Sequence, residues 1–243
     1  DRIIIDAGIT AHESRRYQEY VSMSLLSTSV AQSVDKLLAH CHRRVFSAKA
    51  AIIRQGDPAG ELYFIIRGSV TVLLEDDKGH EIVLAYLNPG EFFGEIGLFN
   101  EDANRTALVR ARSECEIAQI GYKKLKALTE IYPDLILAMT SQLARRLRNT
   151  NRKLGDLAFM DVYGRVARTL LDLCEQPDAM THPNGMQVRV TRQELSRLVG
   201  CSREMVGKVL KDMEDQNHIA ATGKNIVGLG VRPKRPQVAS RIS

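Results

Sequence analysis

A helical segment at residues 133–160 constrains the fold of this 243-residue chain more than any other feature. It opens on Pro133, whose missing N–H costs nothing at a helix start. Its apolar residues then recur every three or four positions for about seven turns. Those positions are Ile136, Met139, Leu143, Leu147, Leu154 and Leu157. So long a stripe exceeds what one small domain covers. It packs either against β-structure of its own chain or against a second copy as a dimer seam, which we favour.

Short β-like runs separated by turn residues precede this helix. "LYFIIRG", "SVTVLLE", "HEIVLAYL" and, after Arg105, "TALVRARSECEIAQI" are the runs, and "RQGDPAGE", "DDKG" and "NPG" are the turns. Many short strands in this arrangement predict a small barrel or roll. Two helical segments flank it, "SVDKLLAHCHRR" and "GYKKLKALTEIYP". The first would place His40 and His42 on a helix beside Cys41.

The segment "RQELSRLVGCSREMVGKVLKDME" has the marks of a helix-turn-helix. Thr191 can cap the first helix and Ser202 the second. Gly200 permits a sharp turn between them, and the small Ser196 allows the helices to approach closely. The side chains available for packing are Leu195, Leu198 and Val199 on the first helix and Met205, Val206, Val209 and Leu210 on the second.

Three charged residues point outward at the start of the second helix: Arg203, Glu204 and Lys208. A recognition helix reads bases from this part, with arginine or lysine on guanine and glutamate on cytosine. The alternative is a solvated helical hairpin. We favour DNA binding, because the turn glycine, the small residue and the two caps occur together with a basic excess. The last 83 residues hold 13 Lys and Arg against 9 Asp and Glu, a net +4 of the total +5. Flanking "QVRVT" and "HIAATGKNIVGL" fit a winged variant with Lys224 at the wing tip.

A candidate anion site lies in "GEFFGEIGLFNEDANRTAL", residues 90–108. Gly94 and Gly97 flank Glu95 and Ile96, and Leu98-Phe99 could begin a helical turn whose free N–H groups bind phosphate. Arg105 would neutralise that phosphate, and Glu95 would accept from a sugar hydroxyl. The competing interpretation is an ordinary surface pair of Glu95 with Arg105. We assign no role to the acidic residues between them.

Several classes of protein are disfavoured. No apolar run approaches the ~20 residues of a membrane span, and no secretory signal is evident, so we expect a cytoplasmic protein without a membrane partner. The four cysteines are too far apart for a metal or redox motif, and we expect all four to be buried. They are Cys41, Cys115, Cys174 and Cys201. Because no nucleophile triad, metal-ligand cluster or Walker-type loop occurs, we do not expect an enzyme.

From about Leu37 to Gly230 the chain resembles the cyclic AMP receptor protein family of bacterial transcription regulators. The motifs at family spacing are "GEFFGEIGLF…RTALVRA", "GDLAFMDVYGRVARTLLDL", "QPDAMTHPNGMQ" and "TRQEL…VGCSREMVG". The resemblance implies an α+β fold: an N-terminal cyclic-nucleotide-binding β-roll of the jelly-roll (double-stranded β-helix) type, a long dimerisation helix and a C-terminal winged helix-turn-helix. The expected boundaries are 31–132, 133–160 and 161–232. Residues 1–30 would be an extension, weakly ordered or added to the natural chain, and 233–243 a basic tail.

The resemblance also implies functional residues. The effector would be cyclic AMP, with the partners double-stranded DNA, RNA polymerase and a second copy of the chain. Cyclic AMP would meet Gly94, Glu95, Ile96, Gly97, Arg105, Thr106, Thr150 and, from the partner subunit, Asn151. DNA would meet Arg203, Glu204 and Lys208 at bases and Arg192 and Ser202 at phosphates, with Lys224 added from the wing. The polymerase-contacting loop at 179–187 would use Thr181, His182 and Gly185.

Some positions depart from the family pattern. Thr106 and Asn151 stand where the best-known members carry serine, Lys208 replaces an arginine, and Gln119 replaces a glutamate on a surface that touches polymerase. Lysine cannot reproduce the bidentate contact of arginine, so the operator sequence can differ. Two rival functions remain at this point. One is a regulator of the same fold that responds to cyclic GMP, cyclic di-GMP or no ligand; the other is a nucleotide-binding regulatory module without DNA activity.

Overall fold

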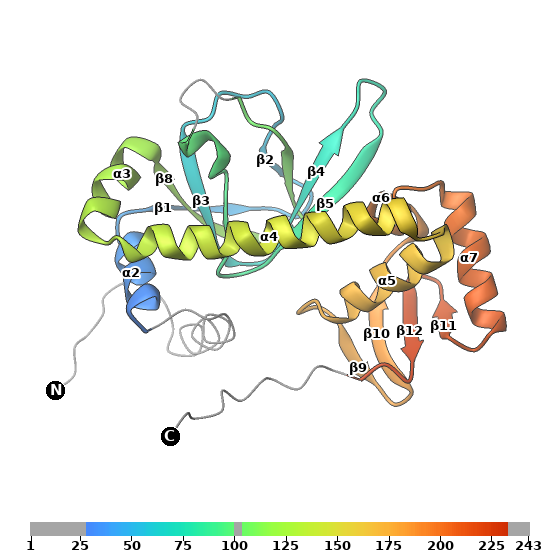
Figure 1. The fold of residues 1–243 in the computed structure, drawn as a ribbon. Coiled ribbons are helices and arrows are strands. Elements are labelled where there is room, and N and C mark those ends of the chain that lie inside the picture. The colour runs from blue at the N-terminus through green and yellow to red at the C-terminus, as the bar shows by residue number, and fades with distance from the viewer. Residues whose placement is uncertain (1–27, 100–103, 233–243) are drawn as a thin grey trace. The chain divides into compact units, whose positions relative to one another are not determined.

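The computed structural model describes residues 28–99 and 104–232, which fall into two compact units (Figure 1). Unit 1 comprises Asp1–Asp76 and Ala85–Leu147, and unit 2 comprises Asp77–Leu84 and Arg148–Ser243. Three segments lie outside the described residues: most of the predicted N-terminal extension, residues 100–103 with their two acidic side chains, and the basic tail. Residues 28–30, which we had placed in the extension, belong to the first helix.

The predicted β-roll is confirmed. Its strands form two four-stranded sheets, in the orders β1-β8-β3-β6 and β2-β7-β4-β5. The strands are β1 (His42–Phe46), β2 (Ala51–Ile53), β3 (Glu61–Arg67), β4 (Val70–Glu75), β5 (Glu81–Leu87), β6 (Phe92–Phe93), β7 (Leu108–Ala111) and β8 (Cys115–Gly121). The first four residues of β5 fall in unit 2. The predicted turns "DDKG" and "NPG" both end on a glycine with positive φ.

Alternation along β3 creates two cores in unit 1. Leu62 and Phe64 pack into a cluster with the helices α2 (Thr28–Leu38), α3 (Tyr122–Ile131) and the start of α4 (Asp134–Phe159). Tyr63 and Ile65 point the other way, into a cluster shared with the second sheet. This is the period-2 pattern of a strand buried on both faces. Figure 1 shows α2 and α3 beside the N-terminal end of α4.

The first predicted helix was too long. It ends at Leu38, and His42 lies instead on β1, opposite Gln119 of β8. His40 lies in the turn between helix and strand. The apolar positions of α2 stop at Leu38, and pairing with the buried strand β8 gives the next residues their backbone partners, so tertiary structure overrides local helix propensity.

The long helix α4 is confirmed at 26 residues. Its first turns belong to the helix-side core, where Leu135, Ala138 and Met139 are buried. Farther along, Leu147, Leu154 and Leu157 are 62%, 65% and 47% exposed in the single chain. Of the six predicted stripe positions the chain buries Met139 alone, since Ile136 is 38% exposed and Leu143 is half-buried.

The described residues of unit 2 hold the end of α4, three further helices and a sheet of order β11-β12-β10-β9. The elements are α5 (Val162–Cys174), β9 (Met180–His182), β10 (Gly185–Arg189), α6 (Arg192–Val199), α7 (Arg203–Asp215), β11 (Ile219–Thr222) and β12 (Asn225–Leu229). The winged helix-turn-helix is thus confirmed. The segment "PDAMTHPNGM", which we had expected to be a loop, instead contains β9 and the start of β10, because His182 pairs with Gly185 across a tight hairpin.

Local signals of the helix-turn-helix were predicted correctly. The Thr191 hydroxyl accepts from the Glu194 N–H at 3.0 Å, and the Ser202 hydroxyl accepts from the Met205 N–H at 3.2 Å. Gly200 ends α6 with φ 72°. The packing prediction for Met205 was wrong, because its side chain is 41% exposed while Val206, Val209 and Leu210 are buried.

The cysteine prediction was only partly right. Cys115 is buried, whereas Cys41, Cys174 and Cys201 are half-buried, and all four are free thiols. Burial raises the pKa of each thiol, that of Cys41 to about 11. The thiols therefore stay protonated near neutral pH and are poor nucleophiles.

Candidate functional site

Glu95 and Arg105 are both buried, at 6% and 9% exposed. A surface ion pair of these residues is therefore the wrong interpretation. They also do not pair with each other: each side chain takes partners from a different part of unit 1. A buried charge needs compensation, so the question becomes what each one faces.

The Arg105 guanidinium faces oxygen atoms of neutral groups. Nη1 donates to the Gly94 carbonyl at 3.1 Å and to the Tyr122 hydroxyl at 3.0 Å, and Nη2 donates to the Glu61 carbonyl at 2.9 Å. Among the described residues no carboxylate lies within ion-pair distance of it. The backbone is fixed too, since the Arg105 N–H donates to Asp57 and its carbonyl accepts from Gly56, both at 2.8 Å.

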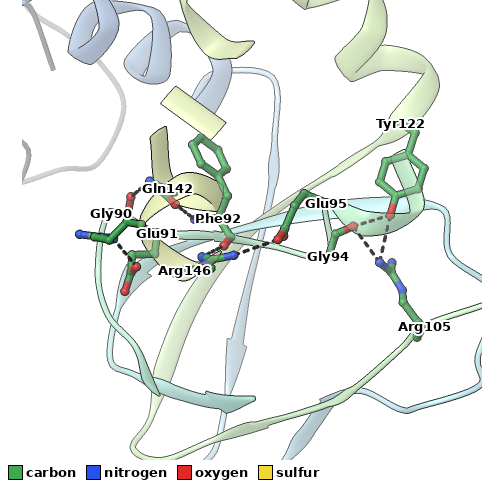
Figure 2. A network of polar contacts seen from close by, with 10 residues as sticks. Gly90, Glu91, Phe92, Gly94, Glu95, Arg105, Tyr122, Gln142 and Arg146 are labelled. Atoms are coloured by element: carbon green, nitrogen blue, oxygen red, sulfur yellow. Dashed lines mark hydrogen bonds and ion pairs between the residues drawn. The ribbon is translucent and has the colours of Figure 1, made fainter. Parts of the chain in front are cut away.

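Tyr122 holds two parts of this site together (Figure 2). Its hydroxyl accepts from Arg105 and donates to the Gly94 carbonyl. Burial raises the pKa of Tyr122 despite the nearby guanidinium, so the phenol stays protonated and keeps donating. On the other side of Arg105, burial and a hydrogen bond to Glu61 raise the pKa of Tyr63 to about 12. Both rings lie within 6 Å of the guanidinium carbon, at 5.5 Å and 5.9 Å.

Gly94 is required by the geometry. Its φ of 82° is left-handed, and a Cβ at this position would lie 2.8 Å from Nη1 of Arg105 and 3.1 Å from the Glu61 carbonyl oxygen. A side chain here would both strain the backbone and displace Arg105. The glycine therefore permits the close approach of the Arg105 guanidinium to the backbone.

The expected helical turn is a single 3₁₀ turn, η1 (Ile96–Leu98). Its N–H groups differ from the prediction, because those of Leu98 and Phe99 already donate to the carbonyls of Glu95 and Ile96. They are not free for a phosphate. A turn this short offers no helix dipole, and the positive charge of the site comes from Arg105.

Glu95 faces α4. Its Oε1 accepts from Nη1 of Arg146 at 3.0 Å, and Nη2 of Arg146 also donates to the Phe92 carbonyl (Figure 2). The two side chains are 8% and 20% exposed. A carboxylate has about four acceptor positions, so this ion pair leaves Glu95 able to accept from a hydroxyl. The sequence interpretation missed Arg146, and only its position on the helical stripe face could have drawn attention to it.

The other predicted ligand residues differ in burial, and two of them lie in unit 2. Ile96 is 54% exposed, and Gly97 is buried against Ala59 and Tyr122. Thr106 is exposed, directly after Arg105. Thr150 and Asn151 are exposed on the part of α4 that belongs to unit 2, so the structure does not join them to the Glu95 and Arg105 site.

The predicted DNA-contacting residues are all exposed and all lie in unit 2. Arg203, Glu204 and Lys208 are exposed on the first turns of α7, and Lys224 is exposed at the turn between β11 and β12. Arg192 is exposed at the start of α6, and its Nη1 lies 3.9 Å from a Cβ placed on Gly207 of α7. Arg192 of α6 thus lies beside α7.

Glu204 is held as an acceptor. Hydrogen bonds from its own N–H and from the Ser202 hydroxyl lower the pKa of this exposed carboxyl. The group remains ionised at neutral pH, as acceptance from a cytosine amino group requires. Ser202 thus serves both as the cap of α7 and as a partner of Glu204.

The three predicted polymerase-contacting residues lie on the β9–β10 hairpin. Thr181 and His182 end β9, and Gly185 begins β10. Gly185 has a steric role as well, because a Cβ there would lie 1.9 Å from the Gly228 carbonyl oxygen of β12. The effect of any change at Gly185 therefore includes a backbone clash.

Two further observations concern residues 28–99 and 104–232. None of their helices is both long and apolar enough to cross a membrane. No group of three or more His, Cys, Asp or Glu side chains among them is arranged to hold a metal ion.

Comparison with known proteins relates both sites to one family. The cyclic nucleotide-binding domain model matches residues 43–132, and the Crp-like helix-turn-helix domain model matches residues 164–229. The chain is 55% identical to the cAMP-activated global transcriptional regulator Vfr of Pseudomonas aeruginosa over 86% of this chain and all of that protein. It is 52% identical to the cAMP-activated global transcriptional regulator CRP of Salmonella typhimurium over 82% and 95%.

A solved structure gives the same relation. The c-di-GMP responsive global regulator CLP of Xanthomonas campestris is similar at a TM-score of 0.78 and 46% identity, covering 82% of this chain and 99% of that one. The relatives with similar sequence are therefore described with two different cyclic nucleotides.

Proposed function

The chain belongs to the cyclic AMP receptor protein family of transcription regulators, and on that premise we propose that it binds cyclic AMP in unit 1 and DNA through unit 2. It acts as a homodimer on a pseudo-palindromic operator and contacts RNA polymerase. We further propose the domain boundaries 31–132, extended at the N-terminal side to Thr28 by α2, 133–160 and 161–232, and a cytoplasmic location.

The buried Arg105 is the observation on which the ligand proposal rests. Its described partners are all uncharged, and burying a cation without an anion is costly. An anionic ligand removes that cost. A cyclic phosphate fits, since it brings one negative charge and oxygens that accept from the N–H groups which Arg105 does not spend on the protein.

Glu95 and Gly94 fit the rest of the nucleotide. The carboxylate held by Arg146 has capacity to accept from a ribose hydroxyl, and the absence of a side chain at Gly94 leaves Arg105 in place. Thr106 has a hydroxyl next to Arg105 for the same phosphate, and Ile96 and Gly97 line the turn that follows Glu95. For the base we propose Thr150 of the same chain and Asn151 of the partner subunit.

The exposed part of the α4 stripe supports the dimer. Leu147, Leu154 and Leu157 are apolar side chains left about half or more exposed by their own chain. Pairing with a second α4 removes them from water. A two-fold dimer then presents two copies of α7 about one DNA turn apart, which is why the operator is a pseudo-palindrome.

On DNA, each protomer reads bases with Arg203, Glu204 and Lys208. Arg192 and Ser202 contact the phosphate backbone, and Lys224 contacts DNA from the wing. Thr181, His182 and Gly185 on the β9–β10 hairpin contact RNA polymerase. The exposure of all the charged members of this set supports the assignment. Ligand binding acts by population shift, favouring the dimer arrangement whose recognition helices match the operator.

Calorimetry and gel shift test the function. We expect cyclic AMP to bind the protein more tightly than cyclic GMP or cyclic di-GMP, and to raise affinity for a palindromic site. Arg105→Ala should abolish both effects. Arg67→Ala is the matched control, since it removes an arginine of the same roll that is 56% exposed and paired with Glu114.

Three results would contradict the proposal. Unchanged cyclic AMP affinity in Arg105→Ala would remove the phosphate role. Tighter binding of cyclic di-GMP, the nucleotide in the description of the regulator CLP, would replace the effector. A protein that never shifts DNA, at any salt concentration, would be a nucleotide-binding module only.

A further inference from the structure

The turn before Glu95 is fastened to α4 by side chains that the ligand site does not use. We define this set as the α4 clamp: Gln142 and Arg145 of α4, together with the turn Asn88–Phe92. All of its members lie in unit 1. Figure 2 shows Gln142 reaching the backbone on either side of Glu91, next to Arg146 and Glu95.

The side-chain amide of Gln142 bonds both an N–H and a carbonyl of the turn, as the backbone of a neighbouring strand would. Its Oε1 accepts from the Phe92 N–H and its Nε2 donates to the Gly90 carbonyl, both at 2.9 Å. The other edge of the same segment bonds to β3, where the Gly90 N–H donates to the Ile65 carbonyl and the Ile65 N–H donates to the Glu91 carbonyl. The segment therefore lies between β3 and α4 and is hydrogen-bonded to both.

Glu91 adds a charged link. One carboxylate oxygen accepts from the Asn88 N–H at 2.8 Å, which closes the turn, and the other accepts from Nη2 of Arg145 at 2.6 Å. The Glu91 side chain is 10% exposed and that of Arg145 is 45% exposed. The link joins a buried acid to a partner at the surface of α4.

The spacing makes these contacts one unit with the ligand site. Gln142, Arg145 and Arg146 are related by i, i+3 and i+4 and so share one face of α4. Arg146 binds Glu95 and also the Phe92 carbonyl, the same residue whose N–H bonds Gln142. A displacement of Glu95 relative to α4 therefore has to stretch the clamp.

We propose that Gln142 and Arg145 are positioning residues that connect occupancy of the nucleotide site to α4. This rests on the proposed function. They hold Phe92 and Glu91 against the helix, so that a ligand seated on Glu95 biases the placement of α4 and, through it, DNA binding. Without the clamp the nucleotide still binds, but its effect on DNA affinity is reduced.

The test measures coupling, defined as the ratio of operator affinities with and without saturating cyclic AMP. We expect Arg145→Gln to lower this ratio about fivefold or more while cyclic AMP affinity of the free protein changes less than threefold. By linkage, the gain in cyclic AMP affinity caused by operator DNA falls by the same factor. Arg148→Gln, which removes an exposed arginine one turn further along, should leave the ratio unchanged.

Gln142→Glu is a second variant for the same measurement. Its carboxylate can still accept from the Phe92 N–H but cannot donate to the Gly90 carbonyl, so we expect a smaller loss of coupling. If Arg145→Gln and Gln142→Glu both retain the full ratio, or if both lose cyclic AMP binding in proportion to a drop in thermal stability, the clamp is only structural and the proposal is wrong. If the unaltered protein shows no coupling, the proposed function fails first and the clamp proposal falls with it.

Discussion

Replacing Arg146 by methionine should leave the buried Glu95 carboxylate of unit 1 without its ion-pair partner. Methionine keeps much of the length and apolar volume of the arginine stem but none of its charge. Removing one partner of a buried pair costs about 3–5 kcal/mol. The Arg146 side chain is 20% exposed, so water can approach the carboxylate that the substitution leaves unpaired. We therefore expect the free energy of unfolding to fall by about 2–3 kcal/mol.

A double-mutant cycle isolates the ion pair from the other contact of Arg146, its bond to the Phe92 carbonyl. The cycle compares Arg146→Met, Glu95→Gln and the double variant by urea denaturation. All samples need one protein concentration, since dimer stability depends on it. We expect a coupling energy of about 2 kcal/mol, with the double variant recovering much of the stability that Arg146→Met loses.

The exposed pair Arg67 and Glu114 provides the control cycle. Its side chains are 56% and 60% exposed at a similar separation of 2.8 Å, so its coupling should stay below about 1 kcal/mol. If the Arg146 and Glu95 coupling is no larger than that of the control, Glu95 is not desolvated as the structure indicates. The reasoning that assigns it a buried, oriented carboxylate would then be refuted.

Three other outcomes follow from the same structure. Gly94→Ala should cost about 1–2 kcal/mol of stability in urea titration, because its φ is left-handed. It should also weaken cyclic AMP binding about tenfold in calorimetry by displacing Arg105, and unchanged binding would contradict the close approach of Arg105 to Gly94. Cys41, with its pKa raised to about 11, should alkylate about a hundredfold more slowly at pH 8 than in the unfolded chain, and its rate should rise with pH, as mass spectrometry can follow. Leu154→Glu should weaken the dimer about a hundredfold in sedimentation while Leu171→Glu, on an α5 site 47% exposed, should not.

Local interactions were predictable from the sequence because both partners lie within a few residues. The Thr191 and Ser202 caps bond to N–H groups three positions on, and Gly200 ends α6 within the same turn. The alternation of β3 and the stripe of α4 are likewise periodic features of one segment. In each case the periodicity or the cap residue itself contains the physical reason for the element.

Interactions between distant segments were not predictable in this way. Arg146 and Glu95 are 51 positions apart, and Tyr122 is 17 positions from Arg105. The interpretation of Glu95 and Arg105 as a pair came from their separation of only ten positions in the sequence. In the fold each side chain has another partner. His42 was assigned to a helix for a related reason, since nothing local announces its pairing with β8.

Burial decides what the two charges can bind. In water an arginine and a glutamate gain about 0–1 kcal/mol from pairing, so an exposed pair would carry no functional meaning. Inside unit 1, Arg146 compensates Glu95, while Arg105 is surrounded by the Gly94 and Glu61 carbonyls and a protonated tyrosine. Among the described residues, the pair of sites therefore presents one positive charge without an ion-pair partner, which a cyclic phosphodiester with one negative charge neutralises. Adenosine 5′-monophosphate has a second negative charge near neutral pH, and the other cation among these groups, Arg146, is already paired with Glu95. We expect it to compete with cyclic AMP at least about a hundredfold more weakly in calorimetry, and equal competition would show that Arg105 is not the charge that selects the ligand.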